Sequence, residues 1–221
     1  MRVLVDGLDL SGKTTLVTAL ATELEARGRQ VAQHRGLLAA RHPARRLLKK
    51  LPLVRQPDSA LVTGAYLLAG YVLDGVLVRA AAPEPPGSVL IQDGYVDRTV
   101  AFGMAGGPYL SAVLALRWPR LFASFDVAVY LHAPSVVRRA RLGLRERPDA
   151  VDIRGVEDAV FAETFTAMLT CGMGRRHNRL LVFDTSQRQP EQMAAAIADT
   201  LLGARPAPAP AAAVGELERA A

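Results

Sequence analysis

One segment near the N-terminus has residue types and spacing that suit the binding of phosphate groups. Residues 7–14 read Gly-Leu-Asp-Leu-Ser-Gly-Lys-Thr, which matches the phosphate-loop pattern G-x-x-x-x-G-K-[ST] without a gap. Glycines let backbone N–H groups turn inward around an anion, and the positive end of a following helix dipole adds to the attraction. The pattern therefore predicts a loop that cradles the phosphates of a nucleoside triphosphate.

Individual side chains of this loop have expected roles. Lys13 can reach the β- and γ-phosphates of ATP, and the Thr14 hydroxyl can hold Mg²⁺. A carboxylate inside an anion-binding loop is repelled by phosphate, so Asp9 either has a functional reason to be there or points to solvent. The residues expected to contact the nucleotide through this loop are Gly7, Leu8, Asp9, Leu10, Ser11, Gly12, Lys13, Thr14 and Thr15.

A second carboxylate follows a run typical of a strand buried on both faces. Val89-Leu90-Ile91 is apolar and β-branched, and it ends on Gln92-Asp93. Ligands of open α/β sheets lie at the carboxyl ends of the strands. We expect Asp93 to hold Mg²⁺, directly or through water, and to orient the acceptor oxygen. The alternative is an ordinary aspartate that opens a turn before Gly94.

Three arginines are spaced three and four residues apart, at Arg138, Arg141 and Arg145, which places them on one stripe of a helix. Like charges at this spacing cost about 0.2–0.5 kcal/mol per pair in a bare helix, and a bound polyphosphate reverses that sign. Arginine forks phosphate oxygens and stabilises charge on a transferring phosphoryl group. We expect Arg141 to act in catalysis and Arg138 and Arg145 to bind the nucleotide. The alternative is a solvated face in an arginine-rich chain.

Motifs elsewhere in the chain indicate which class of nucleotide-binding protein carries this phosphate loop. Guanine-binding GTPases use an Asn-Lys-x-Asp segment, but the sole asparagine, Asn178, is followed by Arg179. Motor ATPases end the metal-binding strand on Asp-Glu, whereas this chain has Asp93-Gly94. A kinase remains, in which ATP and Mg²⁺ serve in-line phosphoryl transfer to a small acceptor, by positioning and preorganised charge.

The order of expected elements indicates the fold. Strands are expected at 2–5, 31–34, 89–91, 127–131 and 180–183, and helices at 13–27, 60–78, parts of 41–55 and of 97–123, from 135, 156–169 and 191–202. Such alternation predicts a three-layer P-loop α/β fold with a five-stranded parallel sheet flanked by helices. We expect one kinase domain at 1–203, with an arginine-rich lid at about 140–155, and a disordered Ala/Pro-rich tail at 204–221.

The bulk composition limits partners and location. The chain has 221 residues and a formal net charge of +6, but its arginines form no basic tail, so nucleic acid is an unlikely partner. The segment 60–78 contains one charged residue, Asp74, and three glycines, and we interpret it as a core helix rather than a membrane span. A single cysteine, Cys171, excludes an internal disulfide, and the start lacks a secretory signal, which favours the cytoplasm.

Four segments together resemble the thymidylate kinase family. They are Val5 to Thr15, Gln92 to Asp97 (Gln-Asp-Gly-Tyr-Val-Asp), Tyr130 to Pro134 (Tyr-Leu-His-Ala-Pro), and Val182 to Ser186 with Pro190-Glu191. The resemblance covers about residues 1–202 and implies an ATP- and Mg²⁺-dependent transfer to a nucleoside monophosphate or related small acceptor. It also implies that Asp9 faces the acceptor sugar or the metal's water and contributes to catalysis.

The acceptor half departs from the family pattern. Gly94 replaces the arginine of the family's Asp-Arg-Tyr segment, and Arg98, one helical turn on, is the expected substitute. No arginine lies within 60–78, and the segment after the second strand is reduced to Arg35-Gly36. The expected acceptor-binding residues are Arg35, Tyr95, Arg98 and Asp74. Thymidylate is expected to be a poor substrate.

Other functions stay open on this sequence. The acceptor can instead be a nucleoside or a non-nucleotide metabolite, or the chain can be a nucleotide-binding regulatory protein whose acceptor site has decayed. In each kinase alternative, the expected partner is a small molecule that accepts the phosphoryl group. We expect no membrane association, and a homodimer stays open.

Overall fold

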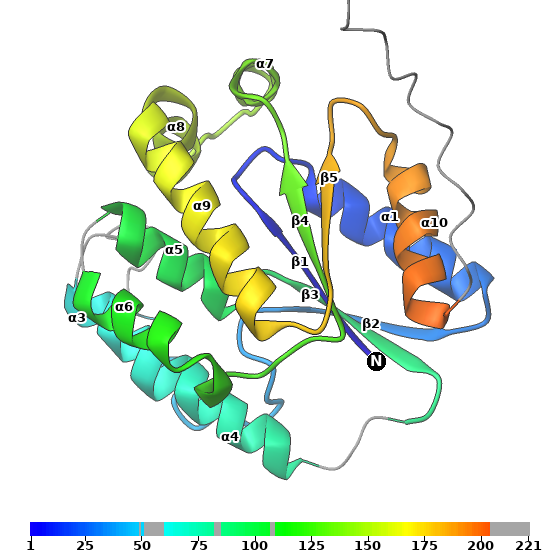
Figure 1. The fold of residues 1–221 in the computed structure, drawn as a ribbon, viewed down its shortest axis with the longest axis horizontal. Coiled ribbons are helices and arrows are strands. Elements are labelled where there is room, and N and C mark those ends of the chain that lie inside the picture. Colours follow the sequence, from blue (N-terminus) through cyan, green and yellow to red (C-terminus); the bar gives the residue numbers. More distant parts are fainter. Residues whose placement is uncertain (49, 51–59, 82–84, 107–108, 204–221) are drawn as a thin grey trace, which may run out of the picture.

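The computed structural model describes residues 1–48, 50, 60–81, 85–106 and 109–203, and its centre is a parallel sheet (Figure 1). The strands are β1 (Arg2–Gly7), β2 (Gln30–Arg35), β3 (Ser88–Asp93), β4 (Val127–His132) and β5 (Leu180–Asp184). They form a five-stranded sheet in the order β2-β3-β1-β4-β5, and every neighbouring pair is parallel. The predicted fold class is confirmed.

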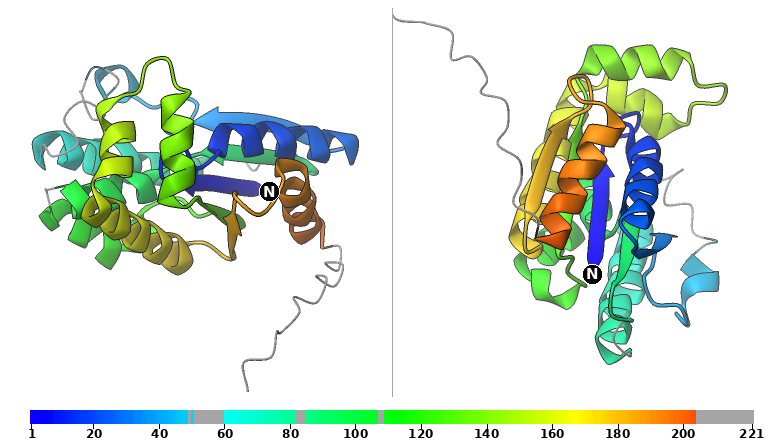
Figure 2. Two further views of the ribbon diagram at one scale, coloured as in Figure 1. Left: turned by 90° about the horizontal axis from the view of Figure 1, so that it is seen from above. Right: turned by 90° about the vertical axis from the view of Figure 1, so that its right-hand side faces the viewer.

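Helices cover both faces of the sheet (Figures 1 and 2). One face carries α1 (Lys13–Ala26) and α10 (Pro190–Leu202). The other carries α3 (Ala60–Ala65), the π-helical η1 (Tyr66–Val72), α4 (Leu73–Ala80), α5 (Val96–Gly106), α6 (Tyr109–Arg117) and α9 (Ala159–Arg176). The remaining elements are α2 (Arg45–Leu48), the 3₁₀ helix η2 (Pro119–Leu121), α7 (Ser135–Gly143) and α8 (Ala150–Glu157).

Alternation along β1 shows why two helical layers are needed. Val3 and Val5 are fully buried against the apolar side of α1 and α10. Leu4 points the other way and joins the cluster of α5 and α9, which includes Phe165. Successive side chains of a strand face opposite sides, so a run that is apolar at every position must be covered on both.

The parallel arrangement brings the chemistry-bearing segments to one edge. Val5 pairs in register with Asp93, and Gly7 pairs with Leu131. The loops that follow β1, β3, β4 and β5 therefore gather at the same end of the sheet. The segment that contains α7 and α8 lies beyond this end, above β4 in Figure 1.

The expected core helix at 60–78 is one continuous helical stretch of α3, η1 and α4, with the π-helical part in its middle. Leu67, Tyr71 and Asp74 of this stretch are buried. Within the ranges that the structure describes, we find no helix with the length and apolar character needed to cross a bilayer.

One expected helix differs from the structure, and two expected segments lie partly or wholly outside the described residues. The helix expected over 156–169 is interrupted, because α8 ends at Glu157 and Asp158 caps a new helix by accepting a hydrogen bond from the Phe161 N–H at 2.9 Å. Of the basic segment 41–55, α2 is present and residues 51–55 lie outside the described residues, as does the tail 204–221.

Candidate active site

The phosphate loop connects β1 to α1 through a tightly packed turn. A β-carbon on Gly7 would lie 2.4 Å from the Leu131 carbonyl oxygen, so only glycine fits this close approach. Leu10 has a left-handed φ of 67°, and its carbonyl accepts a hydrogen bond from Arg141 Nη1 at 2.8 Å. The loop is therefore held in shape by residues far away in the sequence.

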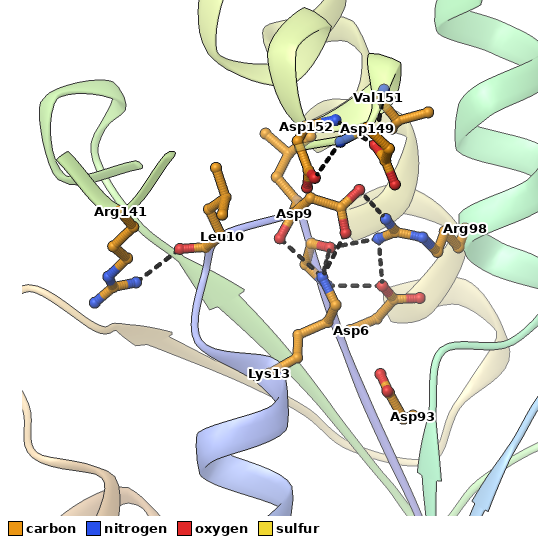
Figure 3. A network of polar contacts seen from close by, with 12 residues as sticks. Asp6, Asp9, Leu10, Lys13, Asp93, Arg98, Arg141, Asp149, Val151 and Asp152 are labelled. Carbon is orange, nitrogen blue, oxygen red and sulfur yellow. Dashed lines mark hydrogen bonds and ion pairs between the residues drawn. The ribbon is translucent and has the colours of Figure 1, made fainter. Parts of the chain in front are cut away.

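Lys13 is folded back over its own loop (Figure 3). Its Nζ donates to the carbonyl oxygens of Gly7 and Leu8, each at 2.9 Å, and lies 3.4 Å from Asp9 Oδ1. Burial and then the charge of Arg98 lower the pKa of Lys13, while three carboxylates around it oppose the shift. The ammonium thus sits at the centre of the loop, where a phosphate oxygen would take over its hydrogen bonds.

Arg98 of α5 fastens the loop from the other side (Figure 3). Its Nη1 donates to the Gly7 carbonyl oxygen at 2.7 Å and reaches Asp6 Oδ1 at 3.4 Å, while Nη2 pairs with Asp9 Oδ2. The guanidinium also lies over the ring of Phe102, 5.2 Å from its centroid. The residue expected to replace the family's arginine therefore contacts the phosphate loop.

Gly94 explains why that arginine is absent from its usual place. Gly94 has a left-handed φ of 67°, and its N–H donates to the Val5 carbonyl oxygen at 3.0 Å. A β-carbon there would lie 3.7 Å from Arg98 Cδ and 3.8 Å from Asp6 Oδ2. The space is open enough, but the backbone conformation is costly for any residue with a side chain.

Asp6 is a site residue that the sequence reasoning missed. It is fully buried, and its Oδ1 accepts a hydrogen bond from the Gly7 N–H at 2.7 Å. Burial raises the pKa of Asp6, although the charges of Arg98 and Lys13 pull it down. The available signal was an acid within a buried strand directly before the first loop glycine.

Two cavities open at this edge of the sheet. The first, which we call the loop cavity, has a volume of about 580 Å³ and lies between the phosphate loop, Arg141, Arg145 and residues 185–190. The second, the aromatic cavity, has a volume of about 290 Å³, and Tyr71, Tyr95 and Phe102 form part of its wall. The residues that line both cavities are Asp9, Lys13, Arg35 and Asp93.

The shared wall carries the carboxylates that the sequence selected. Burial raises the pKa of Asp9, but Arg98 and Lys13 outweigh it, so the net pKa is lowered and the group stays ionised. Asp93 has a side chain that is 20% exposed, and its Oδ2 lies 3.8 Å from Nε of the exposed Arg35. Asp9 and Asp93 therefore both face the place where the two cavities meet.

The donors around the loop cavity fit one kind of magnesium site. Thr14 and Asp93 line this cavity and offer one hydroxyl and one carboxylate. In the described part of the chain, no three His, Cys, Asp or Glu side chains gather as a metal cage. Mg²⁺ commonly binds one or two carboxylates together with substrate phosphates, so this donor set suits Mg²⁺ carried by a nucleotide.

The three arginines after β4 take different positions. Arg141 and Arg145 line the loop cavity, and Arg145 Nη1 also pairs with Asp152 Oδ1. Arg138 is buried, and it donates to the carbonyl oxygens of Ala133 and Gly155. The expected stripe does not extend to Arg145, because α7 ends at Gly143. Arg138 instead ties α7 to α8 within the segment that we expect to be a lid.

The expected acceptor residues Tyr95 and Asp74 are bonded to each other. The Tyr95 hydroxyl donates to Asp74 Oδ2 at 2.6 Å, and the N–H of Ala39 donates to Asp74 Oδ1 at 2.7 Å. Burial and then the charge of Asp74 raise the pKa of Tyr95. Tyr95 lines the aromatic cavity, whereas Asp74 lies fully buried behind it.

Several lining residues were not among the expected ones. Thr99, Phe102, Asp149 and Val151 line the aromatic cavity, and Thr185 and Arg188 line the loop cavity. Asp149 caps α8 by accepting from the N–H groups of Val151 and Asp152. Thr185 belongs to the segment 182–186 that carries the family resemblance, although it was not selected as a site residue. No sequence pattern marks the other five, because they come from elements that meet only in the fold.

The comparisons with known proteins concern the fold. No protein-family model matches the chain, and no curated protein matches its sequence. Among solved structures, it is similar to a deoxyadenosine kinase from M. mycoides with dCMP and a flexible dCDP bound, with a TM-score of 0.56 and 13% identity. The match covers 93% of this chain and 100% of that chain, which shows that the two share a fold.

Proposed function

We propose that this chain is an ATP-dependent kinase that transfers the γ-phosphoryl group to a hydroxyl of a small acceptor. The observation that carries the proposal is the shared wall of the two cavities. A triphosphate in the loop cavity and an acceptor in the aromatic cavity would meet at Asp9, Lys13 and Asp93. In-line transfer needs this arrangement, with the attacking and leaving oxygens on opposite sides of the phosphorus.

The loop cavity supplies charge for the donor. Backbone N–H groups of the loop and the Lys13 ammonium surround the β- and γ-phosphates, and Arg141 and Arg145 face the same cavity. Mg²⁺ held by Thr14, Asp93 and the phosphates would neutralise charge on the triphosphate. During transfer the acceptor oxygen bonds to the γ-phosphorus, the bond to the β–γ bridging oxygen breaks, and Asp93 accepts the hydroxyl proton.

The charges of the aromatic cavity favour an uncharged acceptor. A nucleoside monophosphate would bring a phosphate that needs its own cations. Yet Arg98 is engaged by Asp6, Asp9 and the Gly7 carbonyl, and Arg35 is 86% exposed beside Asp93. Aromatic walls and a volume of about 290 Å³ suit a nucleoside-sized molecule. The similarity to the structure of a deoxyadenosine kinase supports a nucleoside as acceptor.

An acceptor panel with ADP release as readout tests the proposal. We would compare kcat/KM for free nucleosides, nucleoside monophosphates including thymidylate, and simple alcohols. We expect a nucleoside to exceed the matching monophosphate by at least about tenfold, or about 1.4 kcal/mol in transition-state stabilisation. Arg35→Ala would leave this ratio unchanged, because the exposed Arg35 has no part in holding an uncharged acceptor.

Two outcomes would redirect the proposal. If thymidylate wins by about a hundredfold, about 2.7 kcal/mol, Arg98 or Arg35 binds its phosphate, and the thymidylate kinase-like alternative holds. If the protein binds ATP but turns over nothing in the panel, the chain is a nucleotide-binding regulatory protein.

A further inference from the structure

A third cavity lies at the opposite end of the sheet from the phosphate loop. Its volume is about 560 Å³, and five arginines line it: Arg2, Arg79, Arg120, Arg175 and Arg176. They come from the start of β1, the end of α4, η2 and the end of α9. None of the described residues that line it is acidic. We call it the arginine cavity.

Its position separates it from the proposed active site. Arg2 opens β1, at the end marked N in Figure 1, whereas the phosphate loop follows the other end of the same strand. A strand of six residues spans about 20 Å at the usual rise per residue. No residue lines both the arginine cavity and the loop cavity. Binding here is therefore additional to anything that the phosphate loop holds.

Counter-charges near the cavity do not balance its arginines. Asp97 pairs with Arg176, and the Asp126 carboxylate accepts a hydrogen bond from the Arg2 N–H at 2.8 Å. The carboxyl ends of α4 and α9 each add about half a negative charge. Among the described residues, the five guanidinium groups exceed these counter-charges and leave a small surplus of positive charge, which suits a phosphorylated anion.

The arginines differ in how far they are already engaged. Arg79 donates to the carbonyl oxygens of Arg120 and Leu121, at 3.2 and 3.3 Å, and so joins α4 to η2. Arg120 and Arg175 are exposed, and within the described chain their side chains have neither a hydrogen-bond nor an ion-pair partner. Two guanidinium forks at one cavity are thus free to bind oxygen atoms.

A buried atom at the same place lacks an acceptor. The Arg176 side chain is 6% exposed and forms its ion pair with Asp97 through Nη2, but its Nε has no hydrogen-bond partner among the described residues. His177 does not supply one. Its Nδ1 accepts from the Phe125 N–H at 3.2 Å, so Nε2 carries the proton and donates to Asp97 at 3.1 Å. The Nε and Nη2 atoms of Arg176 are both buried, so this residue adds positive charge to the wall of the cavity, while the accessible donors come from other arginines.

We propose that the arginine cavity binds a small phosphorylated anion, with Arg120 and Arg175 as the principal contacts. The ligand class is a phosphate monoester or a diphosphate, because arginine forks pair with phosphate oxygens and the surplus charge is small. This site is separate from the phosphate loop and does not depend on the proposed kinase activity.

Amide shifts in NMR, titrated with inorganic pyrophosphate, locate the binding. In the wild-type chain we expect saturable shifts both in the phosphate loop and at 119–124 with 174–178. In Arg120→Ala/Arg175→Ala the second set loses at least tenfold in affinity and the phosphate-loop shifts persist. The matched control Arg41→Ala/Arg139→Ala removes two exposed arginines that line neither cavity, and it keeps both sets of shifts.

Three results would overturn the proposal. Shifts confined to the phosphate loop would show that the arginine cavity does not bind the probe. Equal affinity in the double variant would remove Arg120 and Arg175 as contacts. Shifts produced by a single-stranded oligonucleotide but not by pyrophosphate would assign the surface to a nucleic-acid backbone instead. If the double variant melts more than a few degrees early, the two single variants replace it and the same comparison applies.

Discussion

The loop cavity and the aromatic cavity share a wall but present charge in different ways. In the loop cavity, Arg141 donates to the Leu10 carbonyl oxygen and Arg145 pairs with Asp152, but both side chains also line open space. In the aromatic cavity, Arg98 is bound by two carboxylates and a carbonyl, and its guanidinium lies over Phe102. We therefore expect arginines to bind a ligand on one side, whereas on the other side an arginine cross-links the structure.

This difference indicates how the fold separates two tasks. In the proposed kinase, the charged donor would be bound by cations that line open space, because such groups can add hydrogen bonds to phosphate oxygens. A neutral acceptor needs shape and hydrogen bonds, and uncompensated charge next to it would cost desolvation energy. Both tasks fit into one edge of the sheet because the residues that meet between the cavities come from the ends of the neighbouring strands β2 and β3 and from the loop and helix that follow β1.

The largest expected effect tests whether the phosphate loop drives the reaction. Lys13→Ala removes the ammonium at the centre of the loop, and we expect kcat to fall about a thousandfold, or about 4 kcal/mol. The fold should persist, because Lys13 bonds mainly within its own loop. Steady-state kinetics with circular dichroism as the control measures both. Turnover close to wild type in a folded variant would remove the proposed mechanism.

The next effect concerns the shared wall. Asp93→Asn keeps the size of the side chain but removes its charge, and we expect kcat to fall about a hundredfold, because the acceptor hydroxyl loses its proton acceptor. Binding of ATP in the absence of Mg²⁺, followed by a fluorescent analogue, should change little. Glu163→Gln, an exposed carboxylate on α9, is the matched control. A change confined to KM would mean that Asp93 binds rather than reacts.

A tenfold effect should be confined to the donor side. Arg141→Ala removes contacts to the Leu10 carbonyl and to the Thr185 hydroxyl, the latter at 3.2 Å. We expect KM for ATP to rise about tenfold while KM for the acceptor stays within twofold. Arg139→Ala, the exposed neighbour on α7, should leave both values alone. Equal rises in the two KM values would show that the cavities are not separable.

The pH dependence of folding stability tests how burial affects the Asp6 carboxyl group. Because burial raises its pKa above that of the unfolded chain, the folded state holds the proton more tightly, and wild-type stability falls as pH rises through the folded pKa. Asp6→Asn cannot ionise, so its Tm relative to wild type should rise from pH 4 to pH 7. Each unit of pKa difference contributes about 1.4 kcal/mol. Calorimetry showing the opposite trend would mean that Arg98 dominates over burial.

The smallest effect belongs to the acceptor side. Tyr71 lines the aromatic cavity, and its ring packs edge-on against Tyr95, with centroids 5.0 Å apart. Tyr71→Phe keeps this packing and removes only the hydroxyl. We expect KM for the acceptor to rise about threefold and KM for ATP to stay unchanged. This pattern is the opposite of the one expected for Arg141→Ala. An effect on ATP alone would reverse the assignment of the two cavities.

The sequence alone determined the fold class and the donor half of the candidate site. Apolar runs predicted the central strands, and all five expected strands, with helices between them, appear in the structure, although β2 is mostly exposed. The phosphate loop could be recognised because its residues are consecutive, so one short pattern contains both the backbone geometry and the side chains. Lys13, Thr14 and Asp93 needed no knowledge of strand order to be selected.

The acceptor half was decided by the tertiary structure. Arg98, Phe102 and Asp149 lie on α5 and at the start of α8, and only the packing of these helices beside β1 brings them to one cavity. Tertiary packing also buries Asp74, which accepts a hydrogen bond from Tyr95, and buries Arg138, which donates to the Ala133 carbonyl oxygen. Arg145 does not continue the stripe of Arg138 and Arg141, because α7 ends two residues before it. Side-chain direction depends on where a helix ends and on what covers it, and neither is contained in local spacing.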